Sequence, residues 1–211
     1  RAGMRFRFQP GQFAWLAARR SPFSLADNPF SISSSAEHPE QLQFTIKSHQ
    51  GFSAEVASLQ VGETVTVDGP HGGFVLDDLP PEVPAVFIGA GVGVTPLLSM
   101  LRTLADRQPE QRCCLWLGNR RADAIVAADA VAELPQRLPN LHIVHALSEP
   151  EQGQGAQRID TNFIDRHWPA DGHHAQFYIC GPDPFMDAVE ACLRLRGIPE
   201  HQIHSERFAM A

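Results

Sequence analysis

The chain has 211 residues, of which 43% are hydrophobic, and this apolar content is enough for one large domain or two small ones. Its formal net charge is −7 without a cluster of basic residues, which argues against a general nucleic-acid-binding protein. No apolar run reaches the roughly 18 residues that a membrane-spanning helix needs.

The four cysteines, Cys113, Cys114, Cys180 and Cys192, show no CxxC spacing. This argues against a disulfide framework, a zinc site or a plant-type iron–sulfur cluster, and it favours a reducing compartment. The histidines also lack metal-ligand spacing, so we expect no bound metal. No signal peptide is visible, and because the chain begins with Arg1 rather than Met we expect it to be a fragment of a longer protein.

Residues 1–79 are predicted to form short strands separated by turns. The segments MRFRF, QFAWLA, QLQFTIK and ETVTVDG are rich in β-forming residues, and glycine or proline lies between them. QLQFTIK alternates, which places Leu42, Phe44 and Ile46 on one face. A short helix is expected over residues 53–59, with Ser53 as its N-cap. This pattern is typical of a small antiparallel β-barrel.

The segment LPPEVP, residues 79–84, is a proline-rich joint that suits a domain boundary. Beyond it, AVFIG, CCLWLG, LHIVHAL and FYICG are predicted to be buried strands. Helical patterns lie between some of them. One begins with Thr95 as cap and Pro96 in the first turn, and another over residues 184–196 is closed by Gly197.

Strands that alternate with helices predict a doubly wound parallel sheet. We therefore expect two domains: an antiparallel Greek-key β-barrel over residues 1–79 and an α/β domain over residues 80–211.

The strongest local motif is FIGAGVGVTPLLSML, in which a buried strand leads through Gly89, Gly91 and Gly93 into a helix. Glycines there let backbone amides approach a pyrophosphate, and the helix N-terminus favours its negative charge. The spacing is G-x-G-x-G rather than the usual dinucleotide fingerprint, and a tight turn without a ligand is the alternative reading.

Asn119, Arg120 and Arg121 follow the next predicted strand. NAD sites usually place an acidic residue near this point, whereas arginines suit a 2′-phosphate. The pattern therefore favours NADPH over NADH, and a solvated arginine pair in a loop is the alternative.

Two further stretches are candidates for binding. The motif CGP, residues 180–182, follows a central strand at the edge where open α/β sheets bind ligands, although a lone buried cysteine is more often a small apolar residue. Lys47, Gly51 and Ser53 surround the start of the short helix and form a candidate anion site, with an ordinary helix cap as an equal alternative.

The motifs PGQF, NPFSIS, GFS, DGPHG, GAGVGVTP, CGP and a final ERF occur in an order and spacing similar to those of the ferredoxin–NADP reductase superfamily. The resemblance covers nearly the whole chain. NPFSISSS, with QFAWL upstream, resembles in particular the dehydrogenase domain of bacterial ferric-reductase-like and NADPH-oxidase-like membrane flavocytochromes.

This resemblance implies FAD in the barrel, NADPH in the α/β domain and four catalytic residues. Phe30 would pack against the flavin ring, and Ser31 would hydrogen-bond near its N5. Cys180 would stand beside the nicotinamide C4, and Glu206 would complete the hydride-transfer site. Phe208 would cover the flavin until NADPH displaces it. The catalytic set is then Ser31, Cys180, Glu206 and Phe208.

The resemblance also implies a set of residues that hold the two cofactors. In the barrel these are Asn28, Pro29, Phe30, Ser31, Ile32, Ser33, Thr45, Lys47, Gly51, Phe52 and Ser53. In the α/β domain they are Gly89, Gly91, Gly93, Val94, Thr95, Pro96, Asn119, Arg120, Arg121, Cys180, Gly181 and Pro182, with Phe208 from the end of the chain.

The implied function is that of an FAD-dependent oxidoreductase that takes a hydride from NADPH and passes on single electrons. In the membrane relatives these electrons reach haems of a transmembrane domain, and then ferric iron or dioxygen. The chain would then be a soluble piece at the cytoplasmic face of a membrane protein. The alternatives are a soluble NADPH:flavin or ferredoxin-type reductase, and a non-catalytic nucleotide-binding electron-transfer subunit.

The chain departs from the family pattern at two places. Phe208 is followed by three further residues, so its displacement is expected to be gated differently. Asn28 stands where the wider family has arginine and the oxidase branch usually histidine. The loss of that cation removes a charge-assisted hydrogen bond to the FAD phosphate, typically about 1.5–3 kcal/mol.

We therefore predict that FAD binds weakly and is easily lost from this chain. Equilibrium titration of the FAD-free protein should give a dissociation constant above the submicromolar range. A submicromolar value would contradict the argument from Asn28.

Overall fold

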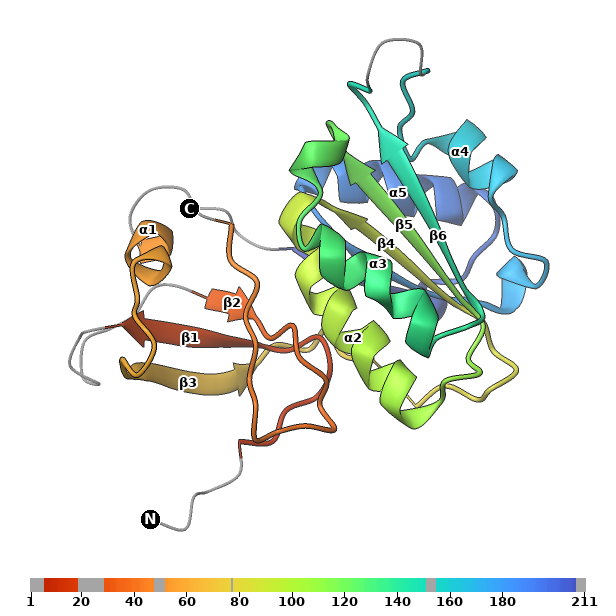
Figure 1. The fold of residues 1–211 in the computed structure, drawn as a ribbon. Coiled ribbons are helices and arrows are strands. Elements are labelled where there is room, and N and C mark those ends of the chain that lie inside the picture. Colours follow the sequence, from red (N-terminus) through yellow and green to blue (C-terminus); the bar gives the residue numbers. More distant parts are fainter. Residues whose placement is uncertain (1–5, 19–28, 48–51, 77, 151–154, 208–211) are drawn as a thin grey trace.

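The computed structural model describes residues 6–18, 29–47, 52–76, 78–150 and 155–207. Figure 1 shows a small sheet with one short helix beside a larger α/β domain, as the sequence predicts. No helix among the described residues is long and apolar enough to cross a membrane.

The small domain is built on an antiparallel sheet with the strand order β2-β1-β3. Its strands are β1 (Phe13–Ala18), β2 (Pro29–Ser31) and β3 (Val65–His71), and its helix is α1 (Phe52–Ala57). Ala14, Leu16 and Ala18 lie on one face of β1 and are buried, and Ala17 on the other face is buried as well. The antiparallel, barrel-like fold expected for this half is confirmed.

The strand expected over residues 41–47 is wrong. Only Phe44 pairs, in a single bridge with Ile32. Next to this bridge the bonding is irregular: Ser33 N donates to Gln43 O at 2.8 Å, but Gln43 N donates to the side chain of Ser34. A side-chain acceptor thus takes the place of a backbone one, and the ladder stops. Residues 6–8 of the MRFRF segment form no strand either.

The α/β domain contains a parallel sheet of five strands in the order β6-β5-β4-β7-β8. The strands are β4 (Ala85–Ala90), β5 (Cys113–Asn119), β6 (Leu141–Leu147), β7 (Gln176–Cys180) and β8 (Ile203–Glu206). The main helices are α2 (Val94–Arg107), α3 (Ala128–Arg137), α4 (Thr161–Arg166) and α5 (Asp183–Leu195). Short 3-10 turns cover Gly91–Gly93, Ala122–Ala124, Gly172–His174 and Glu200–Gln202.

Successive side chains of a strand point to opposite faces of the sheet. Apolar side chains therefore lie on both faces, and helices cover each of them. Phe87 belongs to the core formed with α2 and α3, whereas Val86 and Ile88 belong to the core formed with α4 and α5. The doubly wound α/β architecture is therefore confirmed. The domain boundary at residues 79/80 stays a prediction.

The strand order reverses between β4 and β7. The chain runs outward from β4 through β5 to β6, then returns across the sheet to β7 and β8 on the other side. Open α/β sheets bind ligands outside the carboxyl ends of the strands at such a switch point. The glycine-rich turn follows β4 and the CGP motif follows β7, so both lie at this point.

Two expected helix caps are wrong. Helix α2 begins at Val94 after the 3-10 turn, with Gly93 as its N-cap, and Thr95 is its second residue. The hydroxyl of Thr95 donates to Val92 O at 2.9 Å and fastens the turn instead of capping the helix. Ser53 is likewise the second residue of α1. The glycine stop of α5 is confirmed, because Gly197 has φ +76°.

Candidate functional site

The glycine-rich turn is pressed against the end of strand β7. A Cβ placed on Gly93 would lie 2.1 Å from the carbonyl oxygen of Cys180, so no side chain fits there. A Cβ on Gly181 would lie 3.2 Å from the side chain of Ala90. The turn and the CGP motif, far apart in sequence, are thus packed together at the switch point. Gly91 has φ +56°, a conformation that glycine adopts without strain.

Cys180 and Glu206 meet at the carboxyl ends of β7 and β8, where they are paired in register. Oε1 of Glu206 is 3.1 Å from the position that a Cβ on Gly72 would take, and Phe13 is equally close to that position. Gly72 and Phe13 belong to the small domain. Residues of both domains therefore form one corner, which we call the interdomain corner and define as Phe13, Gly72, Cys180 and Glu206.

Burial controls the charges in this corner. It raises the pKa of Glu206 to about 7, and burial together with the Glu206 charge raises the pKa of the Cys180 thiol far above its usual range. Cys180 is therefore a neutral thiol at physiological pH and is not a nucleophile.

Oε2 of Glu206 is buried and has no hydrogen-bond partner among the described residues. Such an atom is expected where a ligand supplies the partner. Together with the glycine turn, in which Gly93 leaves no room for a side chain, it fits a site for a nicotinamide nucleotide at this corner.

The predicted flavin segment reaches the same corner from the other side. Ser31 is buried at the end of β2, paired in register with Phe13, and Phe30 is half-buried opposite Ala14. Pro29 is exposed and Ile32 fully buried. The structure thus brings Ser31 and Glu206 to either side of Phe13.

Two other predicted flavin contacts are engaged within the protein. Thr45 Oγ1 donates to Ser33 Oγ at 3.1 Å, and Ser33 Oγ donates to Gln43 O at 3.2 Å. Their contact with FAD stays a prediction. So does the anion site at α1, where Lys47 is exposed and Ser53 half-buried. Asn28, Gly51, Phe208 and the side chain of Phe52 lie outside the described part of the chain.

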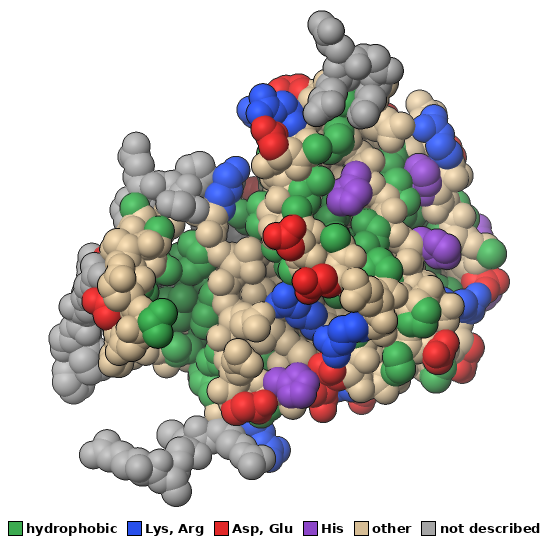
Figure 2. Space-filling view, in the orientation of Figure 1, with side chains coloured by type: hydrophobic (Ala, Val, Ile, Leu, Met, Phe, Trp, Pro, Cys, Tyr) green, Lys and Arg blue, Asp and Glu red, His purple; other side chains and the backbone are tan. Residues whose placement is uncertain are grey.

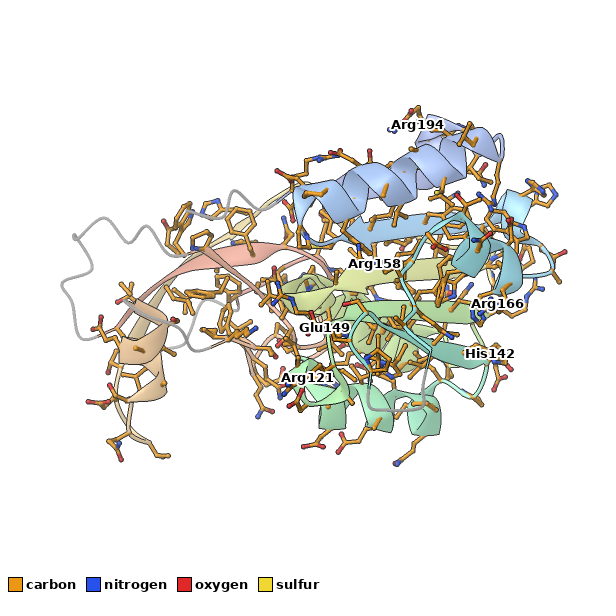
Figure 3. The ribbon with its side chains drawn as sticks, turned by 90° about the horizontal axis from the view of Figure 1, so that it is seen from above. Arg121, His142, Glu149, Arg158, Arg166 and Arg194 are labelled. Atoms are coloured by element: carbon orange, nitrogen blue, oxygen red, sulfur yellow. The ribbon has the colours of Figure 1, made fainter. Side chains whose placement is uncertain are left out.

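The two arginines predicted to hold a 2′-phosphate are exposed and directly follow β5. Arg121 is labelled in Figure 3. Arg121 already has a partner that the sequence analysis missed. Its Nε donates to Asp123 Oδ1 at 3.0 Å, and its Nη2 donates to Asp123 Oδ2. This hydrogen-bonded pair raises the pKa of Arg121 and lowers that of Asp123, and the charge of Glu149 also raises the pKa of Arg121. A 2′-phosphate would compete with these carboxylates.

Charged side chains show no separation by sign on the face in Figure 2, where acidic and basic groups lie next to one another. Within the described residues, no group of three His, Cys, Asp or Glu could hold a metal ion.

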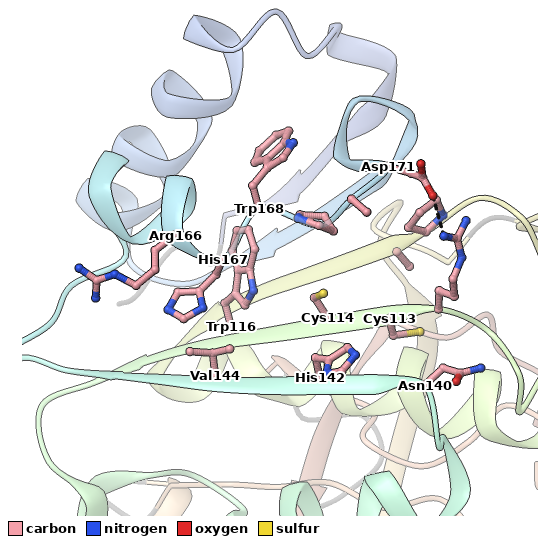
Figure 4. A pocket seen from close by; sticks show the side chains of 15 residues that line it. Cys113, Cys114, Trp116, Asn140, His142, Val144, Arg166, His167, Trp168 and Asp171 are labelled. Atoms are coloured by element: carbon pink, nitrogen blue, oxygen red, sulfur yellow. Dashed lines mark hydrogen bonds and ion pairs between the residues drawn. The ribbon is translucent and has the colours of Figure 1, made fainter.

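A cavity of about 550 Å³ lies at the opposite end of the parallel strands (Figure 4). Its lining includes Cys114, Trp116, His142, His167 and Trp168, from the first halves of β5 and β6 and the loop after α4. The glycine turn and the interdomain corner are at the carboxyl ends of the strands, so this cavity is separate from the candidate site.

Comparison with known protein families decides the classification. Residues 1–75 match the model of an FAD-binding domain, and residues 87–191 match that of the oxidoreductase NAD-binding domain. The two matches together span most of the chain, in the order expected from the motifs. The chain belongs to the ferredoxin–NADP reductase superfamily. FAD and a nicotinamide nucleotide are the cofactors of these two domains.

Several curated members of the superfamily match along nearly the whole chain. The reductase component of propane 2-monooxygenase from Mycolicibacterium goodii is 30% identical, over 97% of this chain and 60% of its own length. The ferredoxin reductase component of 3-ketosteroid-9-alpha-monooxygenase from Mycolicibacterium smegmatis is 30% identical, over 98% of this chain and 57% of its own length. The chain thus spans no more than about 60% of these relatives.

Solved structures agree on the fold. The Amycolatopsis cytochrome P450 reductase GcoB superposes with a TM-score of 0.77 at 26% identity, over 96% of this chain and 61% of that one. The ferredoxin reductase of carbazole 1,9a-dioxygenase reaches 0.79 at 23% identity, over 97% and 62%, which supports the fold alone. The narrower resemblance to membrane ferric reductases and NADPH oxidases is not shown by these relatives.

We predict that Glu206 makes stability depend on pH. Burial raises the folded-state pKa of Glu206 above the unfolded value of 4.5, to about 7. The stability that the protonated carboxyl allows is therefore fully present below pH 4.5 and is lost as the pH rises through about 7. Replacing Glu206 with Gln should therefore increase the free energy of unfolding progressively from about pH 5 to about pH 8, by on the order of 1 kcal/mol after allowance for solvent screening. Chemical denaturation at a series of pH values measures this.

Glu82→Gln is the matched control, because Glu82 is exposed. It removes one carboxylate from the surface, and the pH profile of Glu206→Gln is compared with that of this variant. A Glu206→Gln effect that depends on pH no more than that of Glu82→Gln would contradict the assignment.

Proposed function

We propose that this chain is the reductase part of an electron-transfer system. It takes a hydride from NAD(P)H and passes single electrons to a separate oxygenase or ferredoxin-type acceptor. The observation that carries the proposal is the interdomain corner, where the end of a central strand of the NAD-binding domain meets the FAD-binding sheet. The named relatives support the choice of acceptor, since they are reductase components of monooxygenases.

In this function the chain's residues bind, orient and exclude water. Bound FAD supplies the conversion of a two-electron donor into one-electron transfers. The backbone of Gly89, Gly91 and Gly93 and the N-terminus of α2 hold the phosphates of the nicotinamide nucleotide. Cys180 is neutral and fully buried, so it excludes water from the interdomain corner without adding charge. Glu206 offers its unpaired oxygen to the nucleotide.

The alternative with a transmembrane haem domain and ferric iron or dioxygen as acceptor rests on the NPFSISSS and QFAWL segments. Apolar spans with paired histidines in a longer form of this protein would support it. The relatives favour the reductase component instead.

Hydride transfer is tested by anaerobic absorbance. Protein reconstituted with FAD should show rapid loss of the oxidised flavin band when NADH or NADPH is added. Binding of both nucleotides without bleaching would identify a non-catalytic subunit and overturn the proposal.

Gly93→Ala should slow bleaching by about 100-fold, because the new Cβ forces the turn away from Cys180 and misplaces the nucleotide. Gly73→Ala is the matched control. A Cβ on Gly73 meets no atom within 4 Å, so this variant should bleach at the wild-type rate.

We further propose NADPH as the preferred donor, with Arg120 and Arg121 binding its 2′-phosphate. Because Arg121 is already hydrogen-bonded to Asp123, the preference for NADPH over NADH should be weaker than two arginines without carboxylate partners would give. Asp123→Asn should therefore raise the ratio of kcat/KM for NADPH to that for NADH by about tenfold.

Asp129→Asn removes the same charge from an exposed site in the first turn of α3 and should leave that ratio unchanged. An unchanged ratio in Asp123→Asn would show that Arg121 does not read the 2′-phosphate.

A further inference from the structure

Helix α2 carries a stripe of polar residues among its buried apolar ones. Ser99, Arg102 and Thr103 recur at helical spacing, and Ser99 and Thr103 are fully buried. We call these three residues the α2 stripe. The side of the helix that bears them faces the small domain, at the segment Ser33–Ala36 (Figure 1).

Each member of the α2 stripe bonds to the main chain of that segment. Ser99 Oγ donates to Ser34 O at 2.7 Å, and Arg102 Nη1 donates to Ser33 O at 2.6 Å. Thr103 Oγ1 accepts from Ala36 N at 3.0 Å. Arg102 also donates to Gln43 Oε1 at 2.9 Å.

These hydrogen bonds pair backbone groups of the Ser33–Ala36 segment that would otherwise pair with a neighbouring strand. Ser33, Ser34 and Ser35 are 1%, 4% and 6% exposed, so their backbone groups have little access to water. Buried backbone groups must be paired. Within the described residues, Ser33 N donates to Gln43 O beside the Ile32–Phe44 bridge, and the α2 stripe supplies partners for Ser33 O, Ser34 O and Ala36 N.

The same helix and the same segment each lead directly to the candidate site. Helix α2 follows the glycine turn without a break, and Ser33 follows Ser31 by two residues. The turn is where the nicotinamide nucleotide is expected, and Ser31 is where the flavin is expected. The hydrogen bond from Arg102 to Ser33 O therefore connects the two sides of the candidate site.

We propose that Arg102 is a positioning residue for hydride transfer, which holds the flavin-binding strand at the correct distance from the nicotinamide side. The proposal rests on the proposed function. A displacement of about 1 Å at a reacting centre can cost about 100-fold in rate, so a lost link should appear in the transfer step itself.

A second arginine on the same helix provides the control. Arg107 Nε donates to Glu37 Oε1 at 2.6 Å, also between the two domains. Arg107 and Glu37 are both exposed, and this bond joins two side chains that can move without moving the main chain. Exposed ion pairs of this kind contribute little.

The test compares Arg102→Leu, Arg102→Lys, Ser99→Ala and Arg107→Leu in FAD-reconstituted protein. Anaerobic stopped-flow mixing with increasing NADH or NADPH separates the limiting rate of flavin reduction from the nucleotide dissociation constant. We expect Arg102→Leu to lower the limiting rate per bound flavin at least tenfold with the nucleotide dissociation constant unchanged. Arg102→Lys should recover part of the rate, and Arg107→Leu should match the wild type.

A merely structural role would lower thermal stability or FAD content while the rate per bound flavin stayed at the wild-type value, and that result would overturn the proposal. If Arg102→Leu does not fold, the proposal is tested with Ser99→Ala. This variant removes a single hydrogen-bond donor to the Ser33–Ala36 segment with little change in side-chain volume. It should slow reduction several-fold, and an unchanged rate would overturn the proposal. If neither NADH nor NADPH reduces the flavin of the wild-type protein, the proposed function itself is refuted.

Discussion

The hydrogen bonds between helix α2 and the Ser33–Ala36 segment are the interaction on which the rest of this structure depends. They join an antiparallel sheet and a parallel sheet beside the point where both would present a cofactor. The main chain of NPFSISSS bonds to the helix, whereas the hydroxyls of Ser33 and Ser34 bond to Gln43 within the small domain. Small polar residues allow the helix to approach closely, and they leave their carbonyls available to its side chains.

The chemistry of the corner follows from burial at that junction. The two domains exclude water around Cys180 and Glu206, so the thiol stays neutral and the carboxyl changes its charge near neutral pH. Gly93 is essential to the geometry, because any side chain would collide with the backbone of Cys180. The site therefore binds and aligns, and it contains no activated nucleophile at Cys180.

Much of the fold could be predicted, because buried parallel strands are continuous apolar runs and glycine ends helices. Strand β8 was missed, since IHSE has no apolar run, and residues 41–47 were misread, since alternation does not distinguish a strand from a segment held by serine side chains. Thr95 failed as a cap because a 3-10 turn precedes the helix.

For the site, motif order correctly brought the glycine turn, CGP and Glu206 together. The Arg121–Asp123 pair and the α2 stripe depend on contacts in space. The signal for the α2 stripe was present, as polar residues at helical spacing on an apolar helix. The roles of the individual residues toward FAD and the nucleotide stay predictions.

In the proposed function, a hydride crosses the interdomain corner from the nicotinamide to the flavin. The most direct test is single-turnover stopped-flow reduction with a nicotinamide nucleotide deuterated at C4 on one face or the other. We predict that deuterium slows flavin reduction when it is on one face of the nicotinamide and not when it is on the other, because the corner presents a single side of the ring. Flavin that is not reduced, or that is reduced at the same rate whichever face carries deuterium, would contradict it.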